Sequence, residues 1–372
     1  MPPIRILVVD DSVLVRRMVS QVLSEDGALE VVGVAANGHI ALAKIPQVNP
    51  HLIILDIEMP EMDGLETLTA IRKDYPDLPV IMFSSLTERG AAITLDALSL
   101  GATDYVTKPT NKGSKQAALQ DIRQQLIPKI KAICHQEVSK LSVLPNKIQQ
   151  PPKLLQLSRK IPPKVKIVAI GVSTGGPNAL TTLLSAFPAN FPVPIVIVQH
   201  MPPVFTTRLA QRLNKNCQVS VCEGFSGASI APGQVWIAPG DFHMILEREG
   251  TEIQIRTNQE HPENFCRPAV DVLFRSVAKI YGAGTLGVIM TGMGQDGLHG
   301  CECIREVGGQ IFVQDQATSV VWGMPGMVAN AGLADFVLPL NELGKEILSR
   351  CKGLKLTDLR GGKHPKTQTS KG

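Results

Sequence analysis

Short apolar runs alternate with helix-like runs over residues 1–110, and this alternation is the strongest constraint on the fold. The apolar runs have the length of β-strands, and they lie at residues 4–9, 30–35, 51–55, 79–83 and 103–106. Residues 13–23 have helical spacing, and Ser12 before them is a good helix N-cap. Strands that alternate with helices predict a doubly wound parallel sheet, in which ligands bind beyond the carboxyl ends of the strands.

The same alternation returns in the second half of the chain. Strands are predicted at residues 165–170, 195–199, 234–237 and 286–290, and helices at 178–186 and 268–280. The predicted fold class is therefore α/β, with two doubly wound parallel-sheet domains joined by a linker. The first domain is predicted to be flavodoxin-like, and the second to be a Rossmann-like three-layer domain.

Composition divides the chain into four units. They are a first domain over residues 1–125, a basic Pro- and Gln-rich linker over 126–164, a second domain over 165–350 and a basic flexible tail over 351–372. The last helix of the first domain is predicted over residues 114–134, so it overlaps the start of the linker. Linker composition of this kind indicates a semi-rigid to flexible connection.

Charge is distributed unevenly, although the net charge of the 372 residues is only +4. Residues 111–164 hold eleven Lys or Arg against two Asp or Glu, and residues 351–372 hold six against one. The rest of the chain is therefore acidic. The basic segments are either solvated and flexible, or they contact an acidic partner or an acidic domain face.

Several classes of protein are disfavoured by composition. Aromatic residues are 4% of the chain and no basic helix is interleaved with them, so we expect no nucleic-acid partner. No unbroken apolar run reaches about 18 residues, so the protein is not expected to be membrane-inserted. Seven irregularly spaced cysteines argue against a disulfide framework, and no signal-peptide pattern opens the chain. We expect a cytoplasmic protein.

Polar residues follow the predicted strands of the first domain at or just past their carboxyl ends. They are Asp10, Asp11, Asp56, Ser84 and Lys108. A single aspartate at a strand end is more often a helix cap than a nucleophile, but five such positions converge on one sheet edge. Carboxylates there can hold Mg²⁺ while Asp56 accepts a phosphoryl group, and Lys108 and Ser84 can contact the phosphoryl oxygens.

A second set of residues predicts nucleophilic catalysis. Gly171-Val-Ser173-Thr-Gly175 matches G-x-S-x-G, in which the serine sits on a sharp strand-to-helix turn. His200 and Asp296 follow two other predicted strands, so serine, base and orienting carboxylate can meet at one edge. A dinucleotide-binding loop is disfavoured, because the spacing is not G-x-G-x-x-G and the next strand ends in Gln199-His200.

The first set of residues resembles the receiver domain of bacterial two-component response regulators over residues 4–125. By that resemblance, the backbone carbonyl of Glu58 joins Asp10, Asp11 and Asp56 as a metal ligand. Tyr105 is then an aromatic switch residue, beside Ser84 and Lys108, although core packing would also explain it. A chemotaxis histidine kinase is implied as the phosphodonor.

Residues 165–345 resemble the catalytic domain of chemotaxis protein-glutamate methylesterases. The resemblance is carried by residues 170–177, 198–202, 237–240 and 290–297. It implies hydrolysis of glutamate methyl esters on methyl-accepting chemoreceptors with release of methanol, and deamidation of receptor glutamines. It also implies that phosphorylation activates the enzyme and that the reaction serves chemotactic adaptation. We expect the chain to be a monomer.

The residue types suggest a mechanism. Ser173 attacks the ester, His200 accepts its proton and returns it to methanol, and Asp296 fixes the imidazole tautomer. Thr174 N–H, directly after the nucleophile, is one oxyanion-hole candidate. Met293 N–H is the second and depends mainly on the resemblance, since Gly292 and Gly294 around it could be simple turn glycines.

Two alternatives stay open from the sequence. The second domain could be a non-catalytic receptor adaptor with a vestigial triad, or a receiver-regulated hydrolase acting on another protein ester or amide. We also expect the unphosphorylated first domain to cover the serine site and phosphorylation to loosen it.

Overall fold

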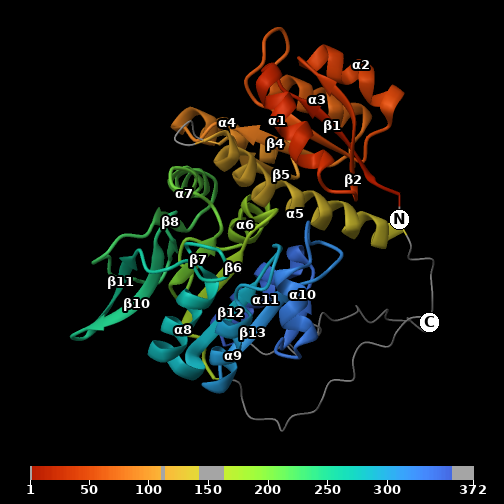
Figure 1. Ribbon diagram of the computed structural model, residues 1–372. Coiled ribbons are helices and arrows are strands. Elements are labelled where there is room, and N and C mark those ends of the chain that lie inside the picture. The colour runs from red at the N-terminus through yellow and green to blue at the C-terminus, as the bar shows by residue number, and fades with distance from the viewer. Residues whose placement is uncertain (1, 110–113, 142–162, 354–372) are drawn as a thin grey trace, which may run out of the picture.

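The computed structural model describes residues 2–109, 114–141 and 163–353. Its first domain contains a five-stranded sheet in the order β2-β1-β3-β4-β5, with every neighbouring pair parallel. The strands are β1 (Ile4–Val9), β2 (Leu29–Ala35), β3 (Leu52–Asp56), β4 (Val80–Ser84) and β5 (Asp104–Thr107). This order is the flavodoxin-like one, in which the strand order reverses between β1 and β3. The first domain is drawn in red to yellow in Figure 1.

Helices cover both faces of the first sheet. They are α1 (Val13–Ser24), α2 (Gly38–Val48), α3 (Gly64–Asp74), α4 (Glu88–Ser99) and α5 (Lys115–Leu141). Ser12 caps α1 as predicted, since its side chain accepts a hydrogen bond from the amide of Val15. Helix α5 extends seven residues beyond the predicted end at 134, and no Pro or Gly interrupts the sequence over residues 135–141.

The second domain is built on a seven-stranded parallel sheet in the order β14-β13-β12-β6-β7-β9-β8. The strands are β6 (Ile167–Val172), β7 (Ile195–Gln199), β8 (Ser220–Glu223), β9 (Gln234–Ile237), β12 (Thr285–Ile289), β13 (Gln310–Gln314) and β14 (Phe336–Leu338). The α/β class with two parallel sheets is therefore confirmed. The sequence had not predicted β8, β13 or β14, of which β8 and β14 are short strands at the two edges of the sheet.

Two helical layers enclose this sheet, which makes the predicted three layers. On one face lie α6 (Gly176–Ser185), α7 (Phe205–Asn216) and α11 (Leu340–Cys351), whose buried residues share a core. On the other face lie α8 (Val270–Tyr281), α9 (Leu298–Glu306) and α10 (Met324–Asn330). A 3₁₀ turn, Gly282–Gly284, precedes β12.

An antiparallel hairpin, β10 (His243–Glu249) with β11 (Glu252–Asn258), was not predicted from the sequence. Its strands carry charged residues on the exposed side, so no long apolar run marks them. The inner side packs Met244, Leu246 and Ile255 into the same core as α8. The hairpin thus packs against α8 on this face of the second sheet.

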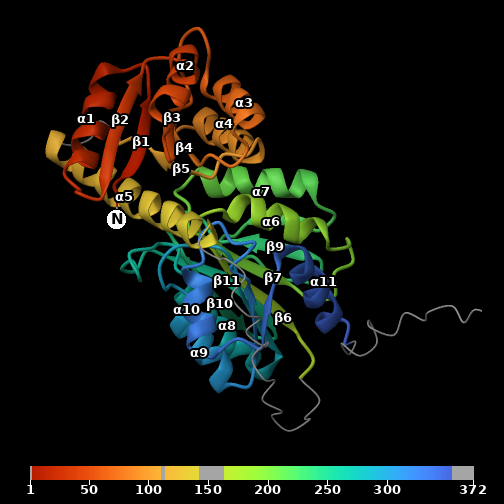
Figure 2. The ribbon, with the colours of Figure 1, turned by 90° about the vertical axis from the view of Figure 1, so that its right-hand side faces the viewer.

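The two domains lie against each other, with α4 of the first packed on α6 and α7 of the second (Figure 2). Helix α5 runs along the boundary, and its residues Ile130 and Ile133 share a core with Val321 of the second domain. None of the helices in the described residues is long and apolar enough to cross a membrane. All seven cysteines are free.

Candidate active site and phosphoacceptor site

The serine site lies at the position in the second sheet where the order of the strands reverses. Strand β6 is flanked by β12 on one side and β7 on the other, so three loops meet beyond its carboxyl end. The amide of Ser173, just after β6, donates to the carbonyl of Thr291 after β12 (3.0 Å). The amide of His200, just after β7, donates to the carbonyl of Val172 (3.2 Å). Nucleophile and base therefore emerge from adjacent, hydrogen-bonded strands.

The nucleophile turn requires glycine at two positions. Gly175 has φ +77°, in the left-handed region that disfavours side chains. At Gly176 a Cβ would lie 1.8 Å from Oε1 of Gln199. The side-chain amide of Gln199 donates to the carbonyl of Ser173 (2.9 Å), so the neighbouring strand β7 holds the turn in place. The positive φ thus explains the last glycine of the G-x-S-x-G pattern, and the close packing explains the glycine that follows it.

His200 and Asp296, the predicted base and orienting carboxylate, lie together in the structure. Nε2 of His200 lies 2.7 Å from Oδ2 of Asp296. Asp296 also accepts hydrogen bonds from the amides of Val270 (2.7 Å) and Asp271 (3.1 Å), at the start of α8. Burial opposes ionisation of Asp296, but the His200 contact and these two amides hold its pKa below the ordinary value. Asp296 is thus a rigid, ionised carboxylate.

Cys266 is a neighbour of His200 and Asp296 that the sequence did not predict. His200, Cys266 and Asp296 bring their ligand-capable atoms within 4.8 Å of one another. Burial alone lowers the pKa of His200, but the Cys266 side chain and the Asp296 carboxylate favour the protonated ring and raise the pKa to about 10. In the described part of the chain, the hydroxyl of Ser173 makes no hydrogen bond to His200. This arrangement favours imidazolium rather than a ready base.

The two oxyanion candidates lie on loops next to the serine. Thr174 is buried, and a Cβ on Gly292 would lie 2.8 Å from Cβ of Ser173, which places the loop of Met293 beside the nucleophile. The backbone N–H groups of Thr174 and Met293 donate to no acceptor among the described residues. Free N–H groups beside a nucleophile are what an oxyanion hole needs.

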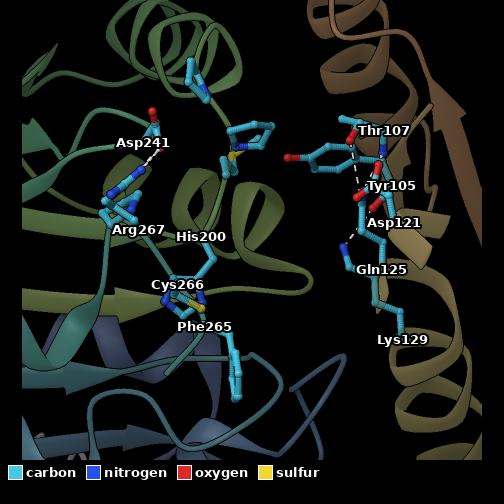
Figure 3. A pocket seen from close by; sticks show the side chains of 14 residues that line it. Tyr105, Thr107, Asp121, Gln125, Lys129, His200, Asp241, Phe265, Cys266 and Arg267 are labelled. Carbon is cyan, nitrogen blue, oxygen red and sulfur yellow. Dashed lines mark hydrogen bonds and ion pairs between the residues drawn. The ribbon is translucent and has the colours of Figure 1, made fainter. Parts of the chain in front are cut away.

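Two cavities open beside His200, and the turn Glu263–Cys266 lies at both. One, of about 600 Å³, lies between the domains and is lined by Tyr105, Gln125 and Lys129 on one side (Figure 3). His200, Cys266 and Arg267 line the other side. The second, of about 420 Å³, is lined by His200, Asn264, Phe265, Cys266, Met293 and Asp296. The first domain therefore forms one wall of the cavity beside His200.

Sequence reasoning missed Asn264, Cys266 and Asp271 as parts of the site. The side-chain amide of Asn264 donates to Oδ1 of Asp296 (3.0 Å) and to Oδ2 of Asp271 (2.8 Å). It thereby holds two buried carboxylates side by side. No motif marks these residues, because they lie about 30 residues before Asp296 and meet it only through the packing of α8.

The acidic residues of the first domain come together as predicted. Asp10, Asp11 and Asp56 place carboxylate oxygens within 4.8 Å of one another. Lys108 reaches between them, with Nζ 3.0 Å from Asp10 and 2.8 Å from Asp56. Burial and the Asp10 carboxylate raise the pKa of Asp56 to about 6, against the opposing effect of Lys108. A cation at this position would offset that repulsion.

The donor set fits Mg²⁺. Oδ2 of Asp56 is buried and has no hydrogen-bond partner, so it is available as a ligand. Asp11 and Glu58 line an adjoining open cavity of about 500 Å³, which can hold the waters that Mg²⁺ retains. The first domain therefore has an acidic cluster consistent with a magnesium site. The role of the Glu58 carbonyl stays a prediction.

The remaining switch candidates are buried. The hydroxyl of Thr94 donates to Oγ of Ser84 (2.7 Å). The Tyr105 ring stacks on Phe205 of the second domain and lies beneath Lys129, whose Nζ is 5.3 Å from the ring centre. Tyr105 thus packs in the domain boundary, and its role as a switch residue stays a prediction.

Comparison with known proteins matches both domains. Residues 6–120 match the response regulator receiver domain, and residues 168–347 match the family described as CheB methylesterase. A protein-glutamate methylesterase/protein-glutamine glutaminase of Trichodesmium erythraeum is 63% identical over 355 residues, covering 94% of this chain and 99% of the relative. One of a Nocardioides species is 49% identical, covering 94% and 96%. The crystal structure of the Thermotoga maritima CheB methylesterase catalytic domain is 42% identical, with a TM-score of 0.49, covering 50% of this chain and 98% of that one.

Proposed function

This chain belongs to the CheB methylesterase family, in which a response regulator receiver domain precedes the methylesterase domain, and we propose from this premise how its residues work. The protein is a protein-glutamate methylesterase/protein-glutamine glutaminase of chemotactic adaptation. Our proposal concerns the residues that perform the reaction, the phosphorylation that controls it and the partners that it requires.

The proposed nucleophile is Ser173. Because Nε2 of His200 is held by Asp296 (2.7 Å), the ring nitrogen that remains for the serine is Nδ1. In the first half-reaction, Ser173 Oγ bonds to the ester carbonyl carbon and its proton passes to His200. The C–O bond to the methoxy group breaks, and His200 returns the proton to release methanol.

Water completes the reaction in the proposed second half. His200 accepts a proton from water, the resulting hydroxide attacks the acyl-enzyme, and the bond to Ser173 Oγ breaks with return of the proton. The products are a glutamate side chain and free enzyme. The N–H groups of Thr174 and Met293 are proposed to stabilise the oxyanion, each contributing roughly 3 kcal/mol in the transition state.

For a receptor glutamine, the same residues are proposed to release ammonia in place of methanol. His200 would then protonate the leaving nitrogen, and hydrolysis of the acyl-enzyme would follow unchanged. We place the reaction in the cytoplasm, on methyl-accepting chemoreceptors as substrates.

The proposed switch is phosphorylation of Asp56 by a chemotaxis histidine kinase. Asp10, Asp11, Asp56 and the Glu58 carbonyl would hold Mg²⁺, which when bound neutralises charge during phosphoryl transfer. Lys108 and Ser84 would contact the phosphoryl oxygens, and Tyr105 would respond to their movement. The buried acidic cluster with Lys108 between its members supports this assignment.

The docked domains support autoinhibition in the unphosphorylated state. Arg208 and Arg212 on α7 pair with Glu88 and Asp96 on α4, each at 2.5 Å. The side-chain amide of Asn178 donates to the carbonyl of Leu98 (2.7 Å). An increase of the undocked fraction from about 1% to about 50% needs only about 2.7 kcal/mol. One phosphoryl group with its new hydrogen bonds can supply that difference.

One observation carries the catalytic proposal. The imidazole of His200 is hydrogen-bonded to the carboxylate of Asp296, and three N–H donors hold that carboxylate in place. Both groups lie beside the strand that ends just before Ser173. An adaptor without catalysis would not require a buried carboxylate to be oriented in this way. Labelling of Ser173 by a fluorophosphonate separates an active hydrolase from an adaptor.

The test is methanol release from membranes that contain methylated receptors, with and without a small-molecule phosphodonor and Mg²⁺. We expect release by the full chain, stimulated by the phosphodonor. Ser173→Ala should abolish release, and Asp56→Asn should keep basal release and lose stimulation. An active Ser173→Ala protein would remove the triad assignment, and stimulation of Asp56→Asn would remove the phosphorylation site.

A further inference from the structure

The turn Glu263–Cys266 has an unusual backbone. Asn264 and Phe265 both have positive φ values, +52° and +62°. Glu263 and Cys266 exchange backbone hydrogen bonds across the turn (3.1 and 2.9 Å). Consecutive left-handed non-glycine residues are uncommon and strained, and they persist where the surroundings hold them in place.

Three contacts hold this turn in place, one to α8 and two to the catalytic site. Glu263 makes a two-point ion pair with Arg275 of α8, with both distances 2.6 Å. Asn264 donates to Asp296, the orienting carboxylate (3.0 Å). Cys266 lies beside His200. The position of the intervening residue, Phe265, is therefore set relative to the reacting groups.

Phe265 itself is fully open to solvent, with an exposed fraction of 104%. It lines both cavities beside His200, the larger of which is shown in Figure 3. The receiver domain forms the opposite wall of the larger cavity but does not cover the ring. A rigid turn that presents an uncovered aromatic ring at the mouth of an active site is typical of an anchor for a large partner.

We propose that Phe265 is a specificity-determining contact for the receptor, binding apolar side chains of the receptor segment that carries the target glutamyl ester. This inference rests on the proposed function. The side chain to be hydrolysed must reach His200, so the receptor segment that bears it must lie across the cavity mouth, where Phe265 is exposed. An aromatic ring there contributes to binding of a protein substrate, whereas a small ester is too short to use it.

The test compares two substrates, methylated receptor membranes and p-nitrophenyl acetate, with the unphosphorylated and the phosphodonor-treated full chain. We expect Phe265→Ala to lower the ratio of the two kcat/KM values about tenfold. Phe265→Leu, which keeps an apolar side chain, should restore most of the ratio. Because Phe265 is fully exposed, neither change removes core packing.

Phe225→Ala is the matched control. Phe225 is also an exposed aromatic (60%), but it packs edge-on against Trp236 and lines neither cavity beside His200. An unchanged ratio in Phe265→Ala, or an equal fall in Phe225→Ala, would overturn the proposed contact while the enzyme assignment stands. Absence of methanol release by the unaltered chain would instead overturn the proposed function, and this inference with it.

Discussion

The ring of Tyr105 stacks on the ring of Phe205, with centroids 4.7 Å apart and planes 5° from parallel. Tyr105 lies on β5, the edge strand of the receiver sheet, and Phe205 is the first residue of α7. Only four residues separate Phe205 from His200, the proposed catalytic base. A movement of Tyr105 would therefore act directly on the segment that leads from His200 into α7.

The ion pairs between α4 and α7 should control basal activity. Arg212 contacts both Asp96 and Ser99 at 2.5 Å. Arg212→Glu replaces this attraction with repulsion, so docking should weaken by about 1 kcal/mol and basal methanol release should rise about fivefold. The measurement is the initial rate without phosphodonor.

Two further variants control this experiment. Lys215→Glu makes the same change on α7 at an exposed lysine that has no ion pair among the described residues, and it should leave the basal rate unchanged. Combining Arg212→Glu with Asp96→Arg restores opposite charges and should lower the rate again. An unaltered rate in Arg212→Glu would show that this pair does not hold the domains together.

The raised pKa of His200 predicts an alkaline rise in activity. The base form of His200 is the deprotonated ring, so a pKa raised from 6.5 to about 10 means that most of the enzyme is protonated at neutral pH. Basal kcat/KM should keep rising between about pH 7 and pH 9 and not level off near pH 7. The measurement is the pH profile of the unphosphorylated chain with correction for spontaneous hydrolysis.

Cys266→Ala tests the cause of that shift. Removing the side chain that favours imidazolium should lower the pKa of His200, so the rising limb should move to lower pH. Identical profiles for the two proteins would remove Cys266 from this account.

Lys108 should compete with Mg²⁺ at the acidic cluster. Its Nζ lies within 3.0 Å of two of the three carboxylates, so Lys108→Met removes a positive charge from the site. Magnesium should then bind about fivefold more tightly in calorimetry at a pH well above 7, while stimulation by the phosphodonor is lost. Lys131→Met, whose partner is Asp26 outside the cluster, is the control. Weaker magnesium binding by Lys108→Met would contradict this prediction.

Position 292 should require glycine, because any side chain there would lie too close to Ser173. A Cβ there would lie 2.8 Å from Cβ of Ser173 and 3.1 Å from its backbone nitrogen. Gly292→Ala should displace the nucleophile and lower kcat for a small ester about tenfold or more. Gly27→Ala, where a Cβ meets nothing within 4 Å, should leave kcat unchanged. The measurement is kcat beside the thermal unfolding midpoint, and a normal kcat in Gly292→Ala would refute the close approach.

Much of the site was predictable because its residues follow strands. Asp10, Asp56, Ser173 and His200 all end or follow a buried apolar run, and parallel strands bring their carboxyl ends to one edge. Alternation of strand and helix therefore determined the fold class and these positions from the sequence alone. The length of α5 was underestimated, and the boundaries of the four units stay predictions.

Tertiary structure alone decided which other groups surround the triad. Asn264 and Cys266 reach His200 and Asp296 through a strained turn that α8 holds in place, and no local pattern reports such a contact. The stacking of Tyr105 on Phe205 depends on how two separately predicted domains meet. Sequence periodicity records which face of each element is buried. Contacts between distant segments depend on the packing of whole layers, and so appear only in the folded chain.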